Sequence, residues 1–270
     1  MNIHPTAVIH PEAKIHPSVT VGPYAVIEGP AVIGEGCVIS AHAILTGVVE
    51  MGPRNTIGHG ALIGGDPQDL AFKPEVESRV VIGEGNRIRE HVTIHRGTAP
   101  GSETVVGNHC YLMAGAHLAH NVRLEDYVIL ANNALLGGYV TIGERVFVGG
   151  GAVFHQYIRV GAYAICQGIS GYGKDLPPYV IGAEVNGVAG INVVGLRRAG
   201  FNAEQRTEVK RAFDILYRRG HNTKQAIAAA ELETWTDVGR RFWDFVRTAT
   251  KKGLCDWIGS RKGSASGGED

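Results

Sequence analysis

The chain has 270 residues, and its 26 basic and 26 acidic side chains give a formal net charge of zero. A neutral chain gives no electrostatic reason to expect nucleic acid or an anionic membrane surface as a partner, and no apolar run reaches the roughly 20 residues that span a bilayer. Glycine is frequent, at 38 residues, whereas aromatic residues make up only 7%. This composition favours a tightly turning backbone around a thin core over a layered α/β domain.

The N-terminal segment MNIHPTAVIH has neither the basic nor the apolar region of a secretion signal. The four cysteines are scattered along the chain and form no CxxC pair or His/Cys metal spacing. We therefore expect a cytoplasmic protein with reduced, buried thiols.

A six-residue repeat begins at Ile3. Steps of six from that residue reach a large aliphatic side chain at every position up to Ile63, and a mostly small residue stands four positions later. Eleven consecutive apolar residues arise by chance roughly once in ten thousand trials at this composition. The period fits neither the 3.6 residues of a helix nor the alternation of a long strand. It predicts an all-β, left-handed parallel β-helix, in which three short strands and three corners close a coil of about 18 residues.

Two insertions interrupt the repeat. Ile63 and Ile82 are 19 residues apart, one more than a multiple of six, so a loop outside the coil is predicted at residues 64–81. A second loop, rich in Gly, Pro and Ser, is predicted at 97–104. Insertions of a solenoid lie on one side and often line its binding face. We therefore expect substrate beside these two loops.

The sequence changes character after Pro178. We predict that the β-helix covers residues 1–185, that a small C-terminal α-helical domain covers 186–258, and that a disordered tail covers 259–270.

Three helices are expected in the C-terminal domain, with Asn202 as the N-cap of the first and Gln205 three positions later. They are predicted over residues 202–220, 222–233 and 236–252. Residues 197–262 carry 15 basic and 8 acidic side chains. A basic helical face suggests an acidic macromolecular partner, although a solvated helix surface explains the same charge.

Among the twelve histidines, His117 and His120 in the segment AGAHLAHN stand out as candidates for chemistry. Residues 18 positions apart stack on neighbouring coils, so His120 is expected to lie under Gly138 and two coils under Gln156. A glycine one strand spacing from a histidine leaves a notch with an exposed N–H, as a general base beside an oxyanion donor requires. A surface histidine beside a corner glycine is the alternative. We expect outer-face positions for the remaining histidines of the middle coils: His42, His59, His91, His95 and His109.

Seven segments carry a family resemblance: DPQDL (66–70), NRIREHVTIHRGT (86–98), AHLAHN (116–121), ILANNALLGG (129–138), HQY (155–157), DLPPYVIG (175–182) and INVVGLRRAGF (191–201). Together they resemble the bacterial UDP-N-acetylglucosamine O-acyltransferases, which carry out the first step of lipid A biosynthesis. The segments follow the family's order and spacing over nearly the whole chain to about Lys252.

The resemblance implies a homotrimer with active sites between subunits, which needs neither a metal nor another cofactor. It implies transfer of an (R)-3-hydroxyacyl group from acyl carrier protein to the 3-hydroxyl of UDP-N-acetylglucosamine, with His120 as general base and the Gly138 N–H stabilising the oxyanion. A glycine matching Gly168 lies on the acyl groove of the family and helps to set chain length. The other positions that match substrate contacts of the family are Gln68, Asp69, His117, His155, Gln156, Asn192 and Arg198.

Three positions depart from the family pattern. Asn121 replaces the Asp that commonly follows the catalytic histidine, and an amide orients His120 without stabilising an imidazolium as a carboxylate does. Ala71 replaces a lysine, for which Lys73 is the candidate substitute. Tyr139 replaces a histidine that touches the sugar in some members. We count Lys73, Asn121 and Tyr139 among the predicted substrate-binding residues, and a UDP-diamino-sugar remains open as an alternative acceptor.

Three other classes share parts of the pattern. The N-acyltransferase of a later lipid A step resembles the AHNV string, but it carries an extra N-terminal domain, whereas the repeat here begins at Ile3. CoA-dependent acetyltransferases with the same coil lack the QDL loop and the helical end. A γ-carbonic-anhydrase-like or purely structural trimer is the third class. The anhydrases need three zinc-binding histidines, typically with an H-x4-H pair, and His117 and His120 have a different spacing.

Overall fold

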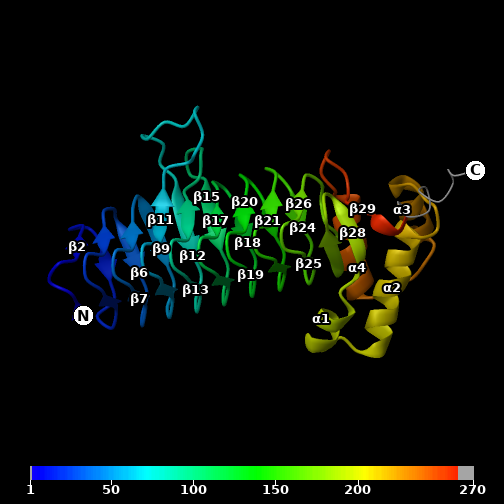
Figure 1. Ribbon diagram of the computed structural model, residues 1–270, viewed down its shortest axis with the longest axis horizontal. Helices are drawn as coiled ribbons and strands as arrows, with labels where there is room; N and C mark the ends of the chain where they lie inside the picture. Colours follow the sequence, from blue (N-terminus) through cyan, green and yellow to red (C-terminus); the bar gives the residue numbers. More distant parts are fainter. Residues whose placement is uncertain (1, 261–270) are drawn as a thin grey trace, which may run out of the picture.

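A β-helix of short strands forms most of the computed structural model, which describes residues 2–260 (Figure 1). The strands belong to three sheets, which we name A, B and C, and the chain visits them in that order in each coil. Sheet A contains β1 (Asn2–Ile3), β4 (Thr20–Val21), β7 (Val38–Ile39), β10 (Thr56–Ile57), β13 (Arg87–Ile88), β16 (Tyr111–Leu112), β19 (Ile129–Leu130), β22 (Phe147–Val148), β25 (Ile165–Cys166), β27 (Val180–Ala183), β28 (Gly187–Ile191) and β29 (Asp256–Trp257).

The other two sheets complete the triangular coil. Sheet B contains β2 (Val8–Ile9), β5 (Val26–Ile27), β8 (Ile44–Leu45), β11 (Leu62–Gly65), β14 (Thr93–His95), β17 (His117–Leu118), β20 (Leu135–Leu136), β23 (Val153–Phe154) and β26 (Gly171–Tyr172). Sheet C contains β3 (Lys14–Ile15), β6 (Ala31–Ile33), β9 (Val48–Met51), β12 (Arg79–Ile82), β15 (Glu103–Val106), β18 (Arg123–Leu124), β21 (Thr141–Ile142) and β24 (Arg159–Val160).

The register between coils confirms the predicted repeat. Where no loop intervenes, strands of neighbouring coils of the repeat pair in parallel with partners 18 residues apart, as Val21 pairs with Ile39 and Leu118 with Leu136. Each coil therefore satisfies its backbone groups by hydrogen bonds to the coils above and below. The fold is the left-handed parallel β-helix that the hexads predict.

A single thin core fills the coil. The large aliphatic residue of each hexad points inward, and Ile27, Ile39 and Leu118 are fully buried. The small residue four positions later, such as Ala43 or Ala134, is also fully buried, because one large and one small side chain fill each edge of the triangle. The hexad pattern therefore identifies the side chains that fill the inside of the coil.

The corners require unusual backbone conformations. Asn121, Tyr139 and Tyr157 occupy the left-handed region, with φ of 60°, 61° and 67°, at the corner where the chain passes from sheet B to sheet C. Such conformations are uncommon outside glycine. They recur here because the same tight corner is built in successive coils of this region.

Both predicted insertions leave the coil as loops. The longer one, residues 66–78, connects β11 to β12 and stands away from the coil above β11 (Figure 1). It is shorter than the predicted 64–81, because β11 continues to Gly65 and β12 already begins at Arg79. The second loop, residues 96–102, connects β14 to β15, so that Glu103 and Thr104 belong to a strand that pairs with β12.

The α-helices of residues 2–260 gather at the C-terminal end of the coil (Figure 1). They are α1 (Val193–Arg198), α2 (Ala203–Tyr217), α3 (Thr223–Glu231) and α4 (Asp237–Arg247), and a short 3-10 helix, η1, covers Ile258–Ser260. Asn202 caps α2 and exchanges hydrogen bonds of 2.9 Å with Gln205, as predicted. No helix within residues 2–260 is long and apolar enough to cross a membrane.

The segment predicted as helical also contributes strands. β28 runs antiparallel to β27, and β29 joins β28, so sheet A continues into residues 186–258. The helix α1 has only six residues and no apolar period, so the sequence pattern did not predict it. Of the predicted tail 259–270, Gly259 and Ser260 lie in η1, and 261–270 lie outside the described residues.

Candidate active site

A cavity of about 260 Å³ lies at the corner where the chain passes from sheet B to sheet C. The strand β17 delivers His117 to it, the corner after β17 delivers His120, and the next two coils deliver Gly138 and Gln156. Five predicted site residues therefore meet here, although they come from three coils and a loop. The full lining is Gln68, His95, His117, Ala119, His120, Gly137, Gly138 and Gln156.

His120 packs directly against Gly138, as the 18-residue stacking predicts. A Cβ added to Gly138 would lie 2.5 Å from Nε2 of His120, closer than any side chain tolerates. Glycine is needed for this space and not for its backbone angle, since φ is not left-handed. Within the described chain the buried N–H of Gly138 donates to no acceptor, whereas the flanking N–H groups of Gly137 and Tyr139 bond to neighbouring coils.

A chain of hydrogen bonds orients the His120 ring. Nδ1 of His120 lies 3.0 Å from Oδ1 of Asn121, and that oxygen also accepts a bond of 3.1 Å from the backbone N–H of Thr98. A backbone N–H can only donate, so the atom that faces both groups is the amide oxygen of Asn121. His120 Nδ1 must therefore carry the hydrogen, which leaves Nε2 as the acceptor on the side of Gly138.

Tyr139 belongs to the same chain of hydrogen bonds. Its hydroxyl lies 2.9 Å from Oγ1 of Thr98, whose own hydrogen is directed to Asn121 Oδ1 at 3.0 Å. The Tyr139 ring packs edge-on to His120, with centroids 5.2 Å apart, and stacks on Tyr157 at 4.8 Å. Both Asn121 and Tyr139 thus contact His120 itself.

His117 forms the floor of the cavity beside His95. Its Nδ1 lies 2.7 Å from Oγ1 of Thr93, and its ring packs edge-on to His95 at 5.1 Å. Burial, together with the neighbouring His95, lowers the pKa of His117 to about 4, so the ring is neutral near pH 7. No group of three or more His, Cys, Asp or Glu side chains within residues 2–260 is arranged to hold a metal ion.

The prediction of an outer-face position is wrong for His95. Its side chain is buried, with 6% exposed, because the loop 66–78 folds over the end of β14 and the backbone carbonyl of Asp66 bonds to Nδ1 at 2.5 Å. Its neighbour Arg96 is also buried and binds the same loop. Both residues stand in a segment that carries the family resemblance, yet no role was predicted for them, because no periodicity reports a contact with an inserted loop.

Asn192 and Arg198 lie at a different corner, where the chain passes from sheet C to sheet A. Asn192 caps α1, since Oδ1 accepts from the Gly195 N–H at 2.9 Å and Nδ2 donates to the Tyr163 carbonyl at 2.8 Å. Arg198 is exposed in the last turn of α1. A hollow of about 290 Å³ joins them, and it is lined by Tyr127, Ile129, Arg145, Tyr163, Asn192, Gly195, Arg198 and Ala199.

Four other predicted residues do not line the cavity. Asp69 is exposed and accepts a bond of 2.9 Å from the Ala71 N–H within the loop. Lys73 lines a separate hollow on the loop. His155 is exposed next to Gln156, and Gly168 lies at the corner between sheets A and B, stacked on Gly150.

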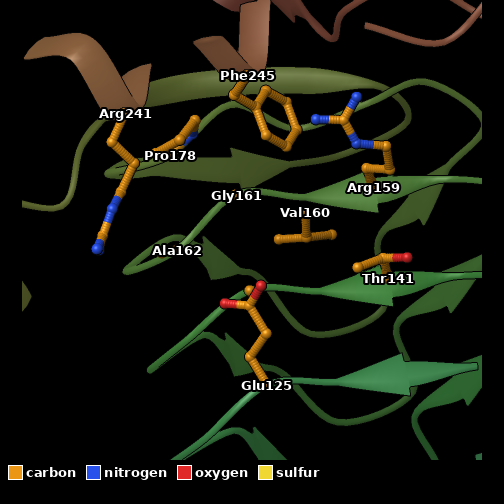
Figure 2. A pocket seen from close by; sticks show the side chains of 10 residues that line it. Glu125, Thr141, Arg159, Val160, Gly161, Ala162, Pro178, Arg241 and Phe245 are labelled. Atoms are coloured by element: carbon orange, nitrogen blue, oxygen red, sulfur yellow. The ribbon is translucent and has the colours of Figure 1, made fainter. Parts of the chain in front are cut away.

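Another hollow, of about 370 Å³, lies on sheet C beneath α4 (Figure 2). In it the Arg159 guanidinium lies 4.3 Å from the centre of the Phe245 ring, and Glu125 points toward the space from below. None of the predicted site residues lines this hollow.

Comparisons with known proteins agree on one family. The family described as "Udp N-acetylglucosamine O-acyltransferase; Domain 2" matches residues 175–255, and the bacterial transferase hexapeptide repeat matches 12–47 and 103–138. The acyl-[acyl-carrier-protein]–UDP-N-acetylglucosamine O-acyltransferase of Syntrophobacter fumaroxidans is 40% identical over 243 residues, which cover 88% of this chain and 94% of the relative.

Solved structures lead to the same conclusion. A UDP-N-acetylglucosamine acyltransferase of Bacteroides fragilis has a TM-score of 0.88 and 39% identity, over 93% of this chain and 98% of the other. The acyltransferase of Francisella novicida has a TM-score of 0.88 and 33% identity, over 99% and 100%. This chain belongs to the UDP-N-acetylglucosamine O-acyltransferase family.

Proposed function

We propose that this protein transfers an (R)-3-hydroxyacyl group from acyl carrier protein to the 3-hydroxyl of UDP-N-acetylglucosamine, the first step of lipid A biosynthesis. The observation that carries the proposal is the pairing of His120 with Gly138 at the cavity, in a chain whose relatives are named for these substrates. All four cysteines are free thiols, in keeping with the reducing cytoplasm in which we place the reaction.

His120 acts as the general base in this proposal. Its free Nε2 takes the proton of the sugar 3-hydroxyl while that oxygen attacks the thioester carbonyl carbon. The developing oxyanion accepts a hydrogen bond from the Gly138 N–H, which has no acceptor within residues 2–260. When the tetrahedral intermediate collapses, the carbon–sulfur bond breaks, and the imidazolium returns the proton to the departing thiolate of the carrier.

The remaining residues of the cavity hold the acceptor. Gln68 and Gln156 offer amide groups in the same cavity as His120, and His117 bonds as a neutral ring because of its low pKa. Asn121 and Tyr139 are proposed to position His120 directly, by a hydrogen bond and an edge-on ring contact, while Thr98 links the two of them. Gly168 leaves the corner without a side chain, beside the exposed Ile169, and this favours a longer acyl chain.

The active site is proposed to lie between subunits of a homotrimer. Asn192 and Arg198, which match nucleotide-sugar contacts of the family, sit one side of the triangular coil away from His120. The outer faces of sheets A and B expose apolar side chains, including Val38, Leu135, Phe147 and Val153. Sheet C instead carries the paired charges of Arg79, Glu103 and Arg123. A cyclic trimer that packs sheet A of one subunit toward sheet B of the next brings the two corners together three times.

The assembly is tested by light scattering of active protein, which should give about three times 28.8 kDa. A monomer with full specific activity would contradict the shared site.

The reaction is tested by mass spectrometry of the products from UDP-N-acetylglucosamine and a set of hydroxyacyl carrier proteins. We expect a mass increase of one hydroxyacyl group in an alkali-labile ester, formed at least about 10²-fold more slowly by His120→Ala. If the protein acylates only a UDP-diamino-sugar, through an alkali-stable amide, or if it uses acetyl-CoA, the proposed reaction is wrong.

A further inference from the structure

We propose that Arg96 is a positioning residue for substrate binding. Its guanidinium binds both legs of the loop 66–78, the first at Asp66 and the second at residues 74–78, and so holds Gln68 at the cavity. The inference rests on the proposed function, since Gln68 is a substrate contact only within that reaction. Arg96 itself does not line the cavity. Its effect on substrate must therefore pass through the loop.

The first leg of the loop is held at Asp66, two residues before Gln68. Nε of Arg96 lies 3.0 Å from Oδ1 of Asp66, and Nη2 lies 2.9 Å from the same oxygen. The backbone carbonyl of Asp66 bonds to the adjacent His95. Two consecutive residues at the end of β14 therefore fix the point from which the loop departs.

The second leg is held by the same guanidinium. Nη2 donates to the carbonyl of Pro74 at 2.9 Å, and Nη1 donates to the carbonyl of Val76 and lies 3.3 Å from Oγ of Ser78. The charge also lies 4.8 Å from the centre of the Phe72 ring. Only a planar group with five donors can reach this set of acceptors at once, so lysine is not an equivalent.

The segment between the two legs has little else to hold it. Residues 68–71 are exposed, and the Leu70 side chain projects fully into solvent. Arg96, in contrast, is buried, with 8% of its surface exposed, and its charge is paired with the Asp66 carboxylate. A loop released from this tether would place Gln68 correctly for only part of the time, and apparent affinity falls by that fraction.

The test replaces Arg96 by Lys and measures both substrates. We expect the KM for UDP-N-acetylglucosamine to rise about tenfold or more, while kcat and the KM for acyl carrier protein change less than about threefold. The reason is that the variant loses binding energy for the nucleotide sugar equally in the ground state and in the transition state. Arg123→Lys, at an exposed ion pair on sheet C, is the matched control and should leave every constant within about twofold. In a Gln68→Ala background Arg96→Lys should add little, since the two residues act as a unit.

Hydrogen exchange supplies a readout that does not depend on activity. The amides of residues 68–73 should exchange faster in Arg96→Lys, because the loop is released from its tether. They should also exchange faster in Asp66→Asn. This second variant keeps the arginine and supplies the test if Arg96→Lys fails to fold. Unchanged exchange, equal rises in KM for both substrates, or full additivity with Gln68→Ala would overturn the positioning role. If the wild-type protein has no activity on UDP-N-acetylglucosamine, the proposed function and the predicted effect on KM are refuted. The hydrogen-exchange result would still show whether Arg96 holds the loop 66–78.

Discussion

Two corners of the same coil share a backbone and differ in chemistry. At the corner between sheets B and C, the left-handed residues Asn121 and Tyr139 fix the ring of His120 by hydrogen bonds and an edge-on contact. At the corner between sheets C and A, Arg145 lies 4.2 Å above the Tyr127 ring, and Asn192 is committed to capping a helix.

The difference teaches that the repeat sets the fold while the corner residues set the function. Each corner adds one side chain per coil in nearly the same place, so a change of residue type changes the chemistry without changing the path of the chain. The first corner holds an acid–base group, and the second offers a cation, aromatic rings and amides. In the proposed function each corner supplies half of a site.

The largest expected effect comes from removing the base. His120→Ala should keep the assembly and its melting temperature and lower kcat by at least about 10²-fold, the usual range for a general base. His16→Ala, at an exposed histidine of the other corner in the first coil, is the control and should keep full activity. If folded His120→Ala keeps its kcat, His120 is not the general base, and the two corners do not differ in this chemistry.

A smaller loss is expected from Gly138→Ala. The new Cβ would overlap the His120 ring, and a displacement of about 1 Å at a catalytic group costs up to about 10²-fold in kcat. Gly190→Ala is the matched control, because nothing lies within 4 Å of a Cβ at that position. Equal activities of the two variants would show that the close stacking on His120 has no catalytic value.

The basic helical end beside the second corner should respond to salt. Exposed lysines such as Lys210 and Lys224 are candidates to dock the acidic carrier. Raising ionic strength from about 0.01 M to 0.1 M shortens screening from about 30 Å to 10 Å, so the KM for acyl carrier protein should rise several-fold more than the KM for the nucleotide sugar. Equal sensitivity of the two constants would argue against docking by charge.

The smallest effect concerns stability at acid pH. The pKa of His117 is lowered from 6.5 to about 4 by burial, so between these values the unfolded chain binds a proton that the folded chain does not. Stability must then fall as pH falls through this window, by at most about 1.4 kcal/mol per pH unit. The melting temperature of His117→Gln should therefore drop less between pH 6.5 and 4 than that of the wild type, whereas His16→Gln should follow the wild type.

Much of this architecture could be predicted from the sequence because the coil repeats. A spacing of 18 residues places His120 beneath Gly138, and the six-residue period predicts the inward aliphatic residues of the coils. The capping box of Asn202 and Gln205 is likewise local, so its residues identify the start of α2 directly.

The parts that escaped prediction depend on contacts between segments of unrelated spacing. His95 and Arg96 are buried only because the loop 66–78 folds back over them. Thr98 orients Asn121 across 23 residues, and β29 reaches sheet A from the far end of the chain. A period in the sequence carries no information on such contacts.

The most direct test of the shared site mixes two defective subunits. The His120→Ala and Arg198→Ala chains carry different tags and are expressed together. Trimers that contain both tags are purified and assayed at low nucleotide-sugar concentration. If His120 of one subunit works with Arg198 of the next, one interface of every mixed trimer is intact, and about one third of wild-type activity should return. Activity no higher than the sum of the two parent variants would contradict the account, because it would mean that each site lies within a single chain.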